Sequence, residues 1–232
     1  MIYIYTPFDQ ESKIEDSSLS PLKNFSSTII FDPINNCKSA GVIPYTFYEG
    51  DLYFLLQCSN SPLKRKDVGW NDFGGKKCSN EETTVEIASR EFNEETSCLF
   101  YLIEQSDKND IYQLLKGNIN LDYNEQTTSI LLNTIPVAQK FFVDRITEYV
   151  IPIYISSKEI YVSFFVKVMY IPESDIPNAE DIHINYSERY LRTCKWFSYG
   201  EIMEMNEKDF HKRLQITKIQ RRIEDYYHKN LF

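Results

Sequence analysis

Residues 74–96 read GGKKCSNEETTVEIASREFNEET, and this stretch decides how the whole chain is interpreted. Two glycines open it, and an Arg-Glu-x-x-Glu-Glu sequence that starts at Arg90 closes it. At about 100° per residue, Glu91, Glu94 and Glu95 share an arc of roughly 100° on one helix face. Helix stability alone does not favour such a cluster, because like charges one turn apart repel each other.

A hard divalent cation would reverse this repulsion. Mg²⁺ and Mn²⁺ prefer oxygen ligands and keep several waters, which leaves coordination positions for the phosphate oxygens of a substrate. On the same helix, Val85, Ala88 and Phe92 form an apolar stripe at i, i+3 and i+7 that can pack on a sheet. The alternative is an ordinary solvated helix surface, since Arg-Glu-x-x-Glu-Glu also occurs by chance.

Further segments have the order that a known family would give them. Residues 39–45 open a strand upstream, residues 74–75 precede the helix, and residues 195–198 lie far downstream. With these segments, the chain resembles the Nudix hydrolases over about residues 38–205. The resemblance implies an α/β fold with a mixed β-sheet sandwiched between helices. It also implies hydrolysis of a diphosphate linkage by water, with metal ions held by the glutamates.

The resemblance assigns roles to the charged residues of the stretch and to one glycine. Arg90 would orient a glutamate through a salt bridge, and Glu82 would support the helix N-terminus or the groups around the metal. Glu91 or a neighbouring carboxylate would also act as general base, and Glu180 or Glu188 would be an additional base from outside this stretch. The ligands of Mg²⁺ or Mn²⁺ would be the backbone carbonyl of Gly75 and the side chains of Glu91, Glu94 and Glu95.

Two positions depart from the family pattern. The family has five residues between its glycine and its first glutamate, and seven more before its arginine. Counting back from Arg90 selects Glu82, whereas counting forward from Gly75 selects Glu81. We favour Glu82, because residue spacing within a helix is stiffer than the length of a loop. Ser97 replaces the closing glycine, and we expect it to end the helix without a positive φ.

The substrate is indicated less directly than the reaction. Residues 90–96, the aromatic-rich composition and the long segment after them resemble the Nudix mRNA-decapping enzymes of large cytoplasmic DNA viruses. This resemblance implies cleavage of the 5′ cap of mRNA with release of methylated GDP. Free nucleoside di- or triphosphates and diphosphoinositol polyphosphates are alternative substrates. A non-catalytic Nudix-like module that binds RNA or a nucleotide is a further alternative, against which the intact glutamates count.

Capped RNA would require aromatic side chains that stack on guanine and basic side chains along the RNA backbone. Trp70, Tyr45 and Phe47 are stacking candidates, although an aromatic residue in a strand is more often part of the core. The candidates for phosphate contacts are Lys64, Arg65, Lys66, Lys76 and Lys77.

Length and composition fit one catalytic domain with additions. The chain has 232 residues, of which 42% are hydrophobic, so it can bury a normal core. We expect an N-terminal extension over residues 1–36, a hydrolase domain over 37–205 and a basic helix over 206–232. The domain would contain an insertion at about residues 104–147, because this segment is longer than a simple loop.

Local patterns predict several elements of this domain. Residues 42–47 and 52–57 are β-prone and flank a turn, so they predict a hairpin. Residues 151–155 and 161–171 return to strand character. The C-terminal segment reads as one amphipathic helix, interpreted either as a solvated cap of the domain or as an RNA contact. Its inward residues would be Ile216, Ile219 and Ile223.

Charge and cysteine content limit the partners and the compartment. A net charge of −9 argues against a protein that coats nucleic acid through bulk electrostatics. The five cysteines show no metal-binding or paired spacing, so we expect no disulfide-linked partner. There is no secretory signal and no run of 18 apolar residues, so we expect no membrane partner. We therefore expect a reducing intracellular compartment, namely the cytoplasm, which could be that of a virus-infected host cell. The oligomeric state is not indicated.

Overall fold

The computed structural model describes residues 37–59, 68–105, 125–146, 150–154, 160–176 and 192–232. All structural statements below concern this part of the chain. Several predictions fall outside it: the N-terminal extension over residues 1–36, the basic residues Lys64, Arg65 and Lys66, and the candidates for an additional base, Glu180 and Glu188.

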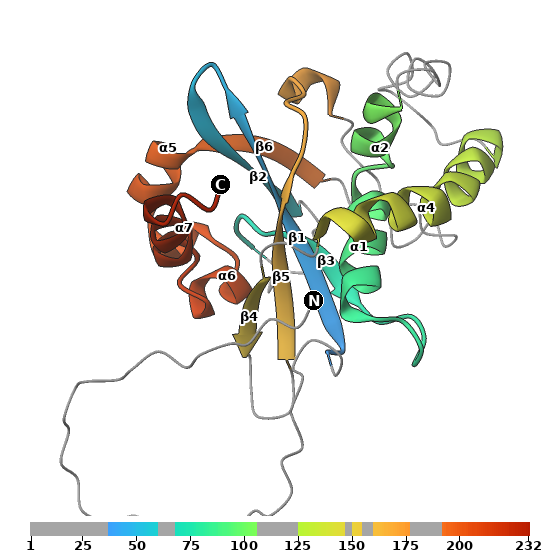
Figure 1. Cartoon of the computed structure of the whole chain (residues 1–232), viewed down its shortest axis with the longest axis horizontal. Helices are drawn as coiled ribbons and strands as arrows, with labels where there is room; N and C mark the ends of the chain where they lie inside the picture. Colours follow the sequence, from blue (N-terminus) through green and yellow to red (C-terminus); the bar gives the residue numbers. More distant parts are fainter. Residues whose placement is uncertain (1–36, 60–67, 106–124, 147–149, 155–159, 177–191) are drawn as a thin grey trace, which may run out of the picture. The chain divides into compact units, whose positions relative to one another are not determined.

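A mixed sheet of six strands forms the centre of the described part (Figure 1). The strand order is β4-β5-β1-β2-β6, and β3 pairs with β1 off this path. The β1 and β5 strands are parallel, and the other pairs are antiparallel. The strands are β1 Ser39–Tyr48, β2 Asp51–Ser59, β3 Phe73–Lys76, β4 Val150–Tyr154, β5 Ile160–Lys167 and β6 Arg192–Ser198.

Helices cover both faces of this sheet, and each face has its own hydrophobic core (Figure 1). The α1, α2 and α4 helices pack on one face, and α5, α6 and α7 pack on the other. The predicted α/β fold, a mixed sheet between helices, is therefore confirmed. The helices are α1 Thr84–Glu95, α2 Leu99–Glu104, α4 Glu125–Ile146, α5 Tyr199–Glu204, α6 Lys212–Ile216 and α7 Ile219–His228, with short 3-10 helices η2 Glu173–Asp175 and η4 Glu207–Asp209.

The hairpin predicted at the start of the domain is confirmed as β1 and β2. Tyr48 lies opposite Asp51, so two residues form the connection. Glu49 and Gly50 both have positive φ, at 52° and 92°. This is the pattern of a type I′ turn, whose twist matches that of the strands it joins.

The α1 helix begins and ends at well-defined residues. Thr83 and Glu86 form a capping box at its N-terminus. Ala88 and Phe92 are fully buried, as the apolar stripe predicted. The prediction for Ser97 was wrong, because Ser97 and Cys98 both have positive φ, at 52° and 56°. These two residues reverse the chain into α2, and their backbone follows from that tight reversal rather than from residue type.

The predicted insertion supplies a helix that supports α1. The α4 helix lies within residues 104–147 and packs along α1. The Ser89 hydroxyl donates to the Gln139 carbonyl at 2.8 Å, and the Gln139 amide donates to the Glu86 carbonyl at 3.0 Å. The α1 helix is therefore held between the sheet and α4.

The C-terminal segment differs from the single helix predicted. It forms η4, α6 and α7, and the break between α6 and α7 falls at Lys218, whose φ is 51°. Ile219 and Ile223 are buried as predicted, but Ile216 is 45% exposed. The break rotates α7 relative to α6, so an apolar pattern counted along one continuous helix assigns Ile216 to the wrong face.

No disulfide joins the five cysteines, all of which lie in the described ranges. Among the described helices, none has both the length and the apolar character that a membrane crossing requires.

Candidate active site

The glycine pair in the middle of β3 is required by close contacts. A Cβ atom at Gly75 would lie within 2.5 Å of the Glu91 carboxylate carbon. A Cβ atom at Gly74 would collide with the Tyr161 hydroxyl and lie 2.5 Å from the Ala40 carbonyl oxygen. Only glycine fits both positions without displacing a neighbour, and the Glu91 carboxylate consequently rests on the backbone of β3.

Arg90 gathers three of the predicted carboxylates at this backbone. Its Nε donates to Glu82 at 2.7 Å, and its Nη1 donates to Glu91 at 3.0 Å and to Glu94 at 2.9 Å. Its Nη2 donates to the Lys76 carbonyl at 2.7 Å, which ties α1 to the end of β3. We call Arg90, Glu82, Glu91 and Glu94 the Arg90 cluster.

The charges of the Arg90 cluster are unbalanced. Three carboxylates contact one guanidinium, an excess of two negative charges within the cluster. Burial alone would lower the pKa of Arg90, but its hydrogen bond to Glu82 and the nearby glutamate charges raise this pKa above its usual value. The arginine therefore stays charged, and the cluster as a whole attracts cations.

The geometry also distinguishes between the two candidates for the first glutamate. Glu82 contacts Arg90 through Oε1, and its Oε2 accepts from the Cys78 backbone N–H at 2.8 Å. Glu81 is exposed and makes no described hydrogen bond to Arg90. The structure therefore gives Glu82 the position that helix spacing indicated, and the extra residue lies in the turn before it.

Glu95 is separate from the Arg90 cluster. Its Oε1 is 2.6 Å from Arg192 Nη1, and its Oε2 accepts from the Gly74 N–H at 3.0 Å and from the Gln57 amide at 2.6 Å. Its side chain is only 5% exposed. Glu95 contacts the ends of β2 and β6, because it lies one turn beyond Glu91 on the helix.

The structure consequently does not bring all the predicted metal ligands together. In the described ranges, no group of three His, Cys, Asp or Glu side chains is placed to hold a metal ion. Glu91 and Glu94 do meet at Arg90 beside Gly75. The carboxylates of Glu91 and Glu94, together with the backbone carbonyl of Gly75, would offer only oxygen donors, and oxygen donors fit a hard cation such as Mg²⁺.

The predicted substrate contacts are dispersed. Lys76 is exposed at the end of β3, and Lys77, the next residue, is half-buried. Trp70 packs edge-on against Phe197 at 4.8 Å, in the core on the face opposite α1. Its contacts are those of a packing residue, and stacking on a base stays a prediction.

The other two stacking candidates lie on β1. Tyr45 is buried on the same face as Trp70 and packs edge-on against Phe232, with ring centroids 5.0 Å apart. Phe47 is exposed, and the Lys167 ammonium lies 5.7 Å above its ring. Tyr45 therefore belongs to the core, whereas Phe47 remains accessible to a ligand.

Sequence reasoning missed the side chains that hold Glu95. Gln57 donates to both Glu95 and the Asp72 carbonyl, and Arg192 donates to Gln57 at 2.5 Å. The only signal was a polar glutamine at the end of an apolar strand. Arg192 is more than 90 residues from Glu95 in sequence, and only the pairing of β2 with β6 brings it near.

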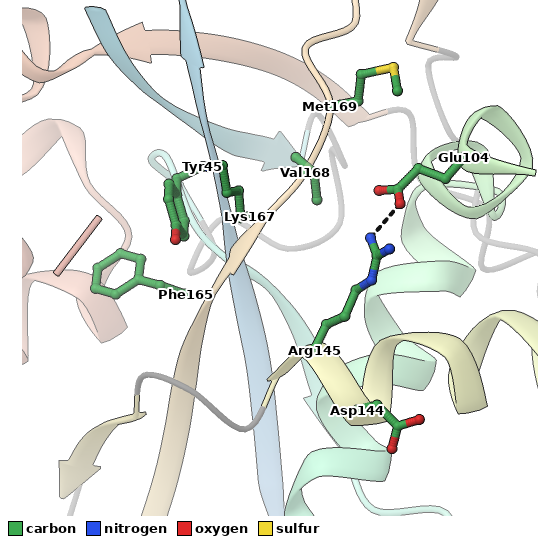
Figure 2. A pocket seen from close by; sticks show the side chains of 8 residues that line it. All are labelled: Tyr45, Glu104, Asp144, Arg145, Phe165, Lys167, Val168 and Met169. Atoms are coloured by element: carbon green, nitrogen blue, oxygen red, sulfur yellow. Dashed lines mark hydrogen bonds and ion pairs between the residues drawn. The ribbon is translucent and has the colours of Figure 1, made fainter.

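A cavity of about 520 Å³ lies elsewhere in the fold (Figure 2). It opens between the end of β5 and the C-terminal ends of α2 and α4, where Arg145 pairs with Glu104. No member of the Arg90 cluster lines it. Its lining residues are Tyr45, Glu104, Asp144, Arg145, Phe165, Lys167, Val168 and Met169.

Fold and site together define an α/β protein with a glycine pair in strand β3 and an arginine–carboxylate cluster at the following helix. No protein-family model matches the chain. The chain is 58% identical over 214 residues to uncharacterized protein L534 of Acanthamoeba polyphaga mimivirus, covering 87% of this chain and 70% of the viral protein. The chain therefore belongs to the same family as this mimivirus protein.

Solved structures show more distant likenesses. A C. elegans Ap4A hydrolase in a binary complex has 12% identity and a TM-score of 0.42, over 83% of this chain and 99% of the hydrolase. Shewanella oneidensis NrtR has 11% identity and a TM-score of 0.35, over 81% of this chain and 64% of NrtR. Likenesses of this size carry no argument about activity.

Proposed function

We propose that the protein is a metal-dependent pyrophosphohydrolase of the Nudix type that cleaves a diphosphate linkage. The observation that carries the proposal is the Arg90 cluster beside Gly75. An ordinary solvated surface would leave its glutamates apart, whereas here one guanidinium collects three carboxylates against the backbone of β3. This concentrates negative charge where a divalent cation and a diphosphate would meet.

The chain's own residues have distinct tasks in this proposal. Glu91, Glu94 and the Gly75 carbonyl would hold Mg²⁺ or Mn²⁺, and the bound ion would neutralise phosphate charge and acidify water. Arg90 fixes the carboxylates of Glu91 and Glu94, and Glu82 holds Arg90 from the opposite side. Glu91 or a neighbouring carboxylate of the cluster would accept the proton of the attacking water.

Among the predicted metal ligands, Glu95 is the one that the geometry supports least. In the structure it binds Arg192, Gln57 and the Gly74 amide. We propose that it orients β3 in the state described here, and that ligation by Glu95 would require it to leave Arg192.

We infer that the diphosphate belongs to the 5′ cap of mRNA, and that the protein acts in the cytoplasm of a virus-infected cell. Two observations support this inference. Residues 90–96 resemble the viral decapping enzymes, and the relative at 58% identity is a viral protein. Lys76 and Lys77 next to the cluster suit RNA phosphates, although they suit small polyphosphates equally well.

The test compares substrates rather than assuming one. Purified protein is incubated with Mg²⁺ or Mn²⁺ and cap-labelled RNA, free cap analogue, nucleoside triphosphates or a diphosphoinositol polyphosphate. Glu94→Gln serves as the inactive control, and Glu81→Gln serves as the matched control outside the cluster.

The expected result is release of methylated GDP from capped RNA that needs metal and is lost in Glu94→Gln only. Turnover of the small compounds without RNA cleavage would contradict the mRNA cap as substrate and would support the pyrophosphohydrolase activity. Absence of turnover with every compound, together with metal-independent RNA or nucleotide binding, would replace the hydrolase with a binding module.

A further inference from the structure

A second polar network lies under the glycine strand, on the face opposite α1. The Tyr161 hydroxyl donates to Asp72 Oδ2 at 2.8 Å, and the Ser163 hydroxyl donates to the same oxygen. The Tyr161 hydroxyl also lies so close to Gly41 and Gly74 that a Cβ at either position would overlap it. Gly74 is therefore supported from below by Tyr161, while Glu95 holds its N–H from the α1 side.

Arg213 of α6 completes this network. Its Nη2 is 2.7 Å from Asp72 Oδ1, and its guanidinium lies 4.0 Å from the centroid of the Tyr161 ring. In the described part of the chain, Asp72 Oδ1 has no hydrogen-bond partner, so the charge of Arg213 is what compensates this fully buried oxygen. Burial raises the pKa of Tyr161 well above its ordinary value, so the hydroxyl keeps the proton that it donates.

The two networks meet in the backbone just before the glycines. The Asp72 carbonyl accepts from the Gln57 amide at 2.8 Å, and the same amide donates to Glu95. A continuous chain of polar contacts thus runs from Arg213 through Asp72 and Gln57 to Glu95. It crosses the sheet at the residues that precede Gly74 and Gly75.

Stability alone does not require a charge pair at this place. A buried ion pair costs desolvation, and apolar residues of similar volume are often equally stabilising or better. Hydrogen bonds and charges do provide direction, which apolar contacts lack. The contacts of this pair all converge on the strand that ends beside the Arg90 cluster.

We propose that Tyr161, Asp72 and Arg213 are positioning residues that set the glycine strand at the height where Gly75 and Glu91 bind metal. The C-terminal helices thereby control the metal site from the opposite face of the sheet. This inference rests on the proposed function for its metal, and it adds residues that touch neither metal nor substrate.

The main comparison is between two substitutions on the same strand and in the same core. Tyr161→Phe removes only the hydroxyl, whereas Phe165→Leu destabilises the neighbouring core without touching Asp72 or Gly74. Mn²⁺ affinity is measured by electron paramagnetic resonance of the full chain, at a temperature where circular dichroism finds each variant folded. Hydrogen exchange of the Gly74 amide and the kcat and KM of any substrate turned over are measured in parallel.

We expect Tyr161→Phe to weaken Mn²⁺ binding roughly tenfold, as loss of a supporting partner commonly does. The Gly74 amide should exchange faster, and kcat should fall while KM stays within about twofold. Phe165→Leu should leave Mn²⁺ affinity and Gly74 exchange near those of the wild type. Arg213→Lys keeps the charge and should retain more Mn²⁺ affinity than Arg213→Met.

An equal loss of Mn²⁺ affinity in Tyr161→Phe and Phe165→Leu would mean that the network only stabilises the fold, and this result would overturn the inference. Wild-type affinity in Tyr161→Phe would overturn it as well. Failure of the proposed function is a separate outcome, in which the wild type hydrolyses no diphosphate. Mn²⁺ binding and Gly74 exchange would then still decide the positioning role, and absence of Mn²⁺ binding by the wild type would reject it.

Discussion

Two arginines organise polar clusters on opposite faces of the same sheet, and their charge balance differs. Arg90 serves three carboxylates that are partly exposed, so its cluster has an excess of two negative charges. Arg213 serves one fully buried carboxylate, Asp72, and the pair is neutral. The balanced pair is complete as it stands, whereas the unbalanced cluster gains from a cation.

This difference in charge balance indicates which cluster mainly stabilises the fold and which one is suited to bind a ligand. A buried charge must be compensated by the protein itself, because water cannot reach it. A partly exposed cluster can stay unbalanced, because solvent and ions compensate it until a ligand arrives. Substitutions in the Arg90 cluster should therefore change activity strongly and stability weakly. Substitutions in the Arg213 pair should change stability strongly and should reach activity only through the position of the glycine strand.

The largest effect is expected for Glu91→Gln. It removes one of the carboxylates that hold the metal, so the rate should fall roughly 10²–10⁴-fold, as for loss of a general base. The unfolding temperature should stay unchanged or rise slightly, since repulsion within the cluster is relieved. Steady-state kinetics and thermal unfolding measure the two quantities.

Glu81→Gln is the matched control for this prediction. Glu81 is exposed and adjacent to Glu82, but it makes no described hydrogen bond to Arg90. Its rate should remain within about twofold of the wild type, because surface charges contribute little. Wild-type turnover in Glu91→Gln would place the chemistry outside the Arg90 cluster.

A large loss of stability is expected for Arg213→Met. The substitution leaves the Asp72 carboxylate buried and uncompensated, which costs about 3–5 kcal/mol. Combining it with Asp72→Asn should restore more than half of the loss, because the buried charge is gone. Urea unfolding measures both changes.

Arg90→Met is the companion variant for the other cluster. It should cost less stability than Arg213→Met, and Mg²⁺ should recover part of the loss, because the released carboxylates remain accessible to ions. An equal, Mg²⁺-independent cost for Arg90→Met would contradict the contrast between the two arginines.

A smaller effect is expected for Gly75→Ala. The new methyl group would displace the Glu91 carboxylate, and a shift of this kind can lower a rate by about 10²-fold. Stability should change little, since the end of a flexible side chain can move away. Gly74→Ala should be less tolerated, because its methyl group would meet the backbone of Ala40. A rate unaffected by Gly75→Ala would show that Glu91 need not rest on β3.

The smallest effect is expected for the reactivity of the Cys78 thiol, which depends on the electrostatic potential of the Arg90 cluster. The Cys78 thiol is largely exposed, but its partial desolvation raises its pKa. The charge of Arg90 lowers this pKa, and the charges of the three carboxylates of the Arg90 cluster raise it. Glu94→Gln or added Mg²⁺ should therefore lower this pKa. At pH 8 the thiolate fraction would rise, and the reaction of Cys78 with a thiol reagent should accelerate roughly twofold.

The reaction is measured in a Cys58→Ser background, which removes one of the two half-buried thiols, the other being Cys194. The remaining thiols react slowly, since burial raises their pKa well above 9.0. They are Cys37, with a pKa of about 11, and Cys98 and Cys194, each with a pKa of about 12. A rate insensitive to both Glu94→Gln and Mg²⁺ would mean that the cluster carries no excess charge at Cys78.

Much of the fold followed from local patterns. The hairpin at Glu49 and Gly50 and the α1 helix were predicted because turn residues and apolar periodicity act over a few positions. Ser97 and Ile216 were assigned wrongly. In both cases the backbone breaks or reverses to satisfy packing with distant elements, which no local pattern encodes.

The sequence by itself determined the α1 face with its glutamates, because spacing along one helix fixes which side chains are neighbours. Tertiary structure decided which of these glutamates meet at Arg90 and which one turns to Arg192. It also brought Asp72, Tyr161 and Arg213 together under the glycine strand. These partners are separated by dozens of residues, and only the pairing of strands and the packing of α6 on the sheet set their distances.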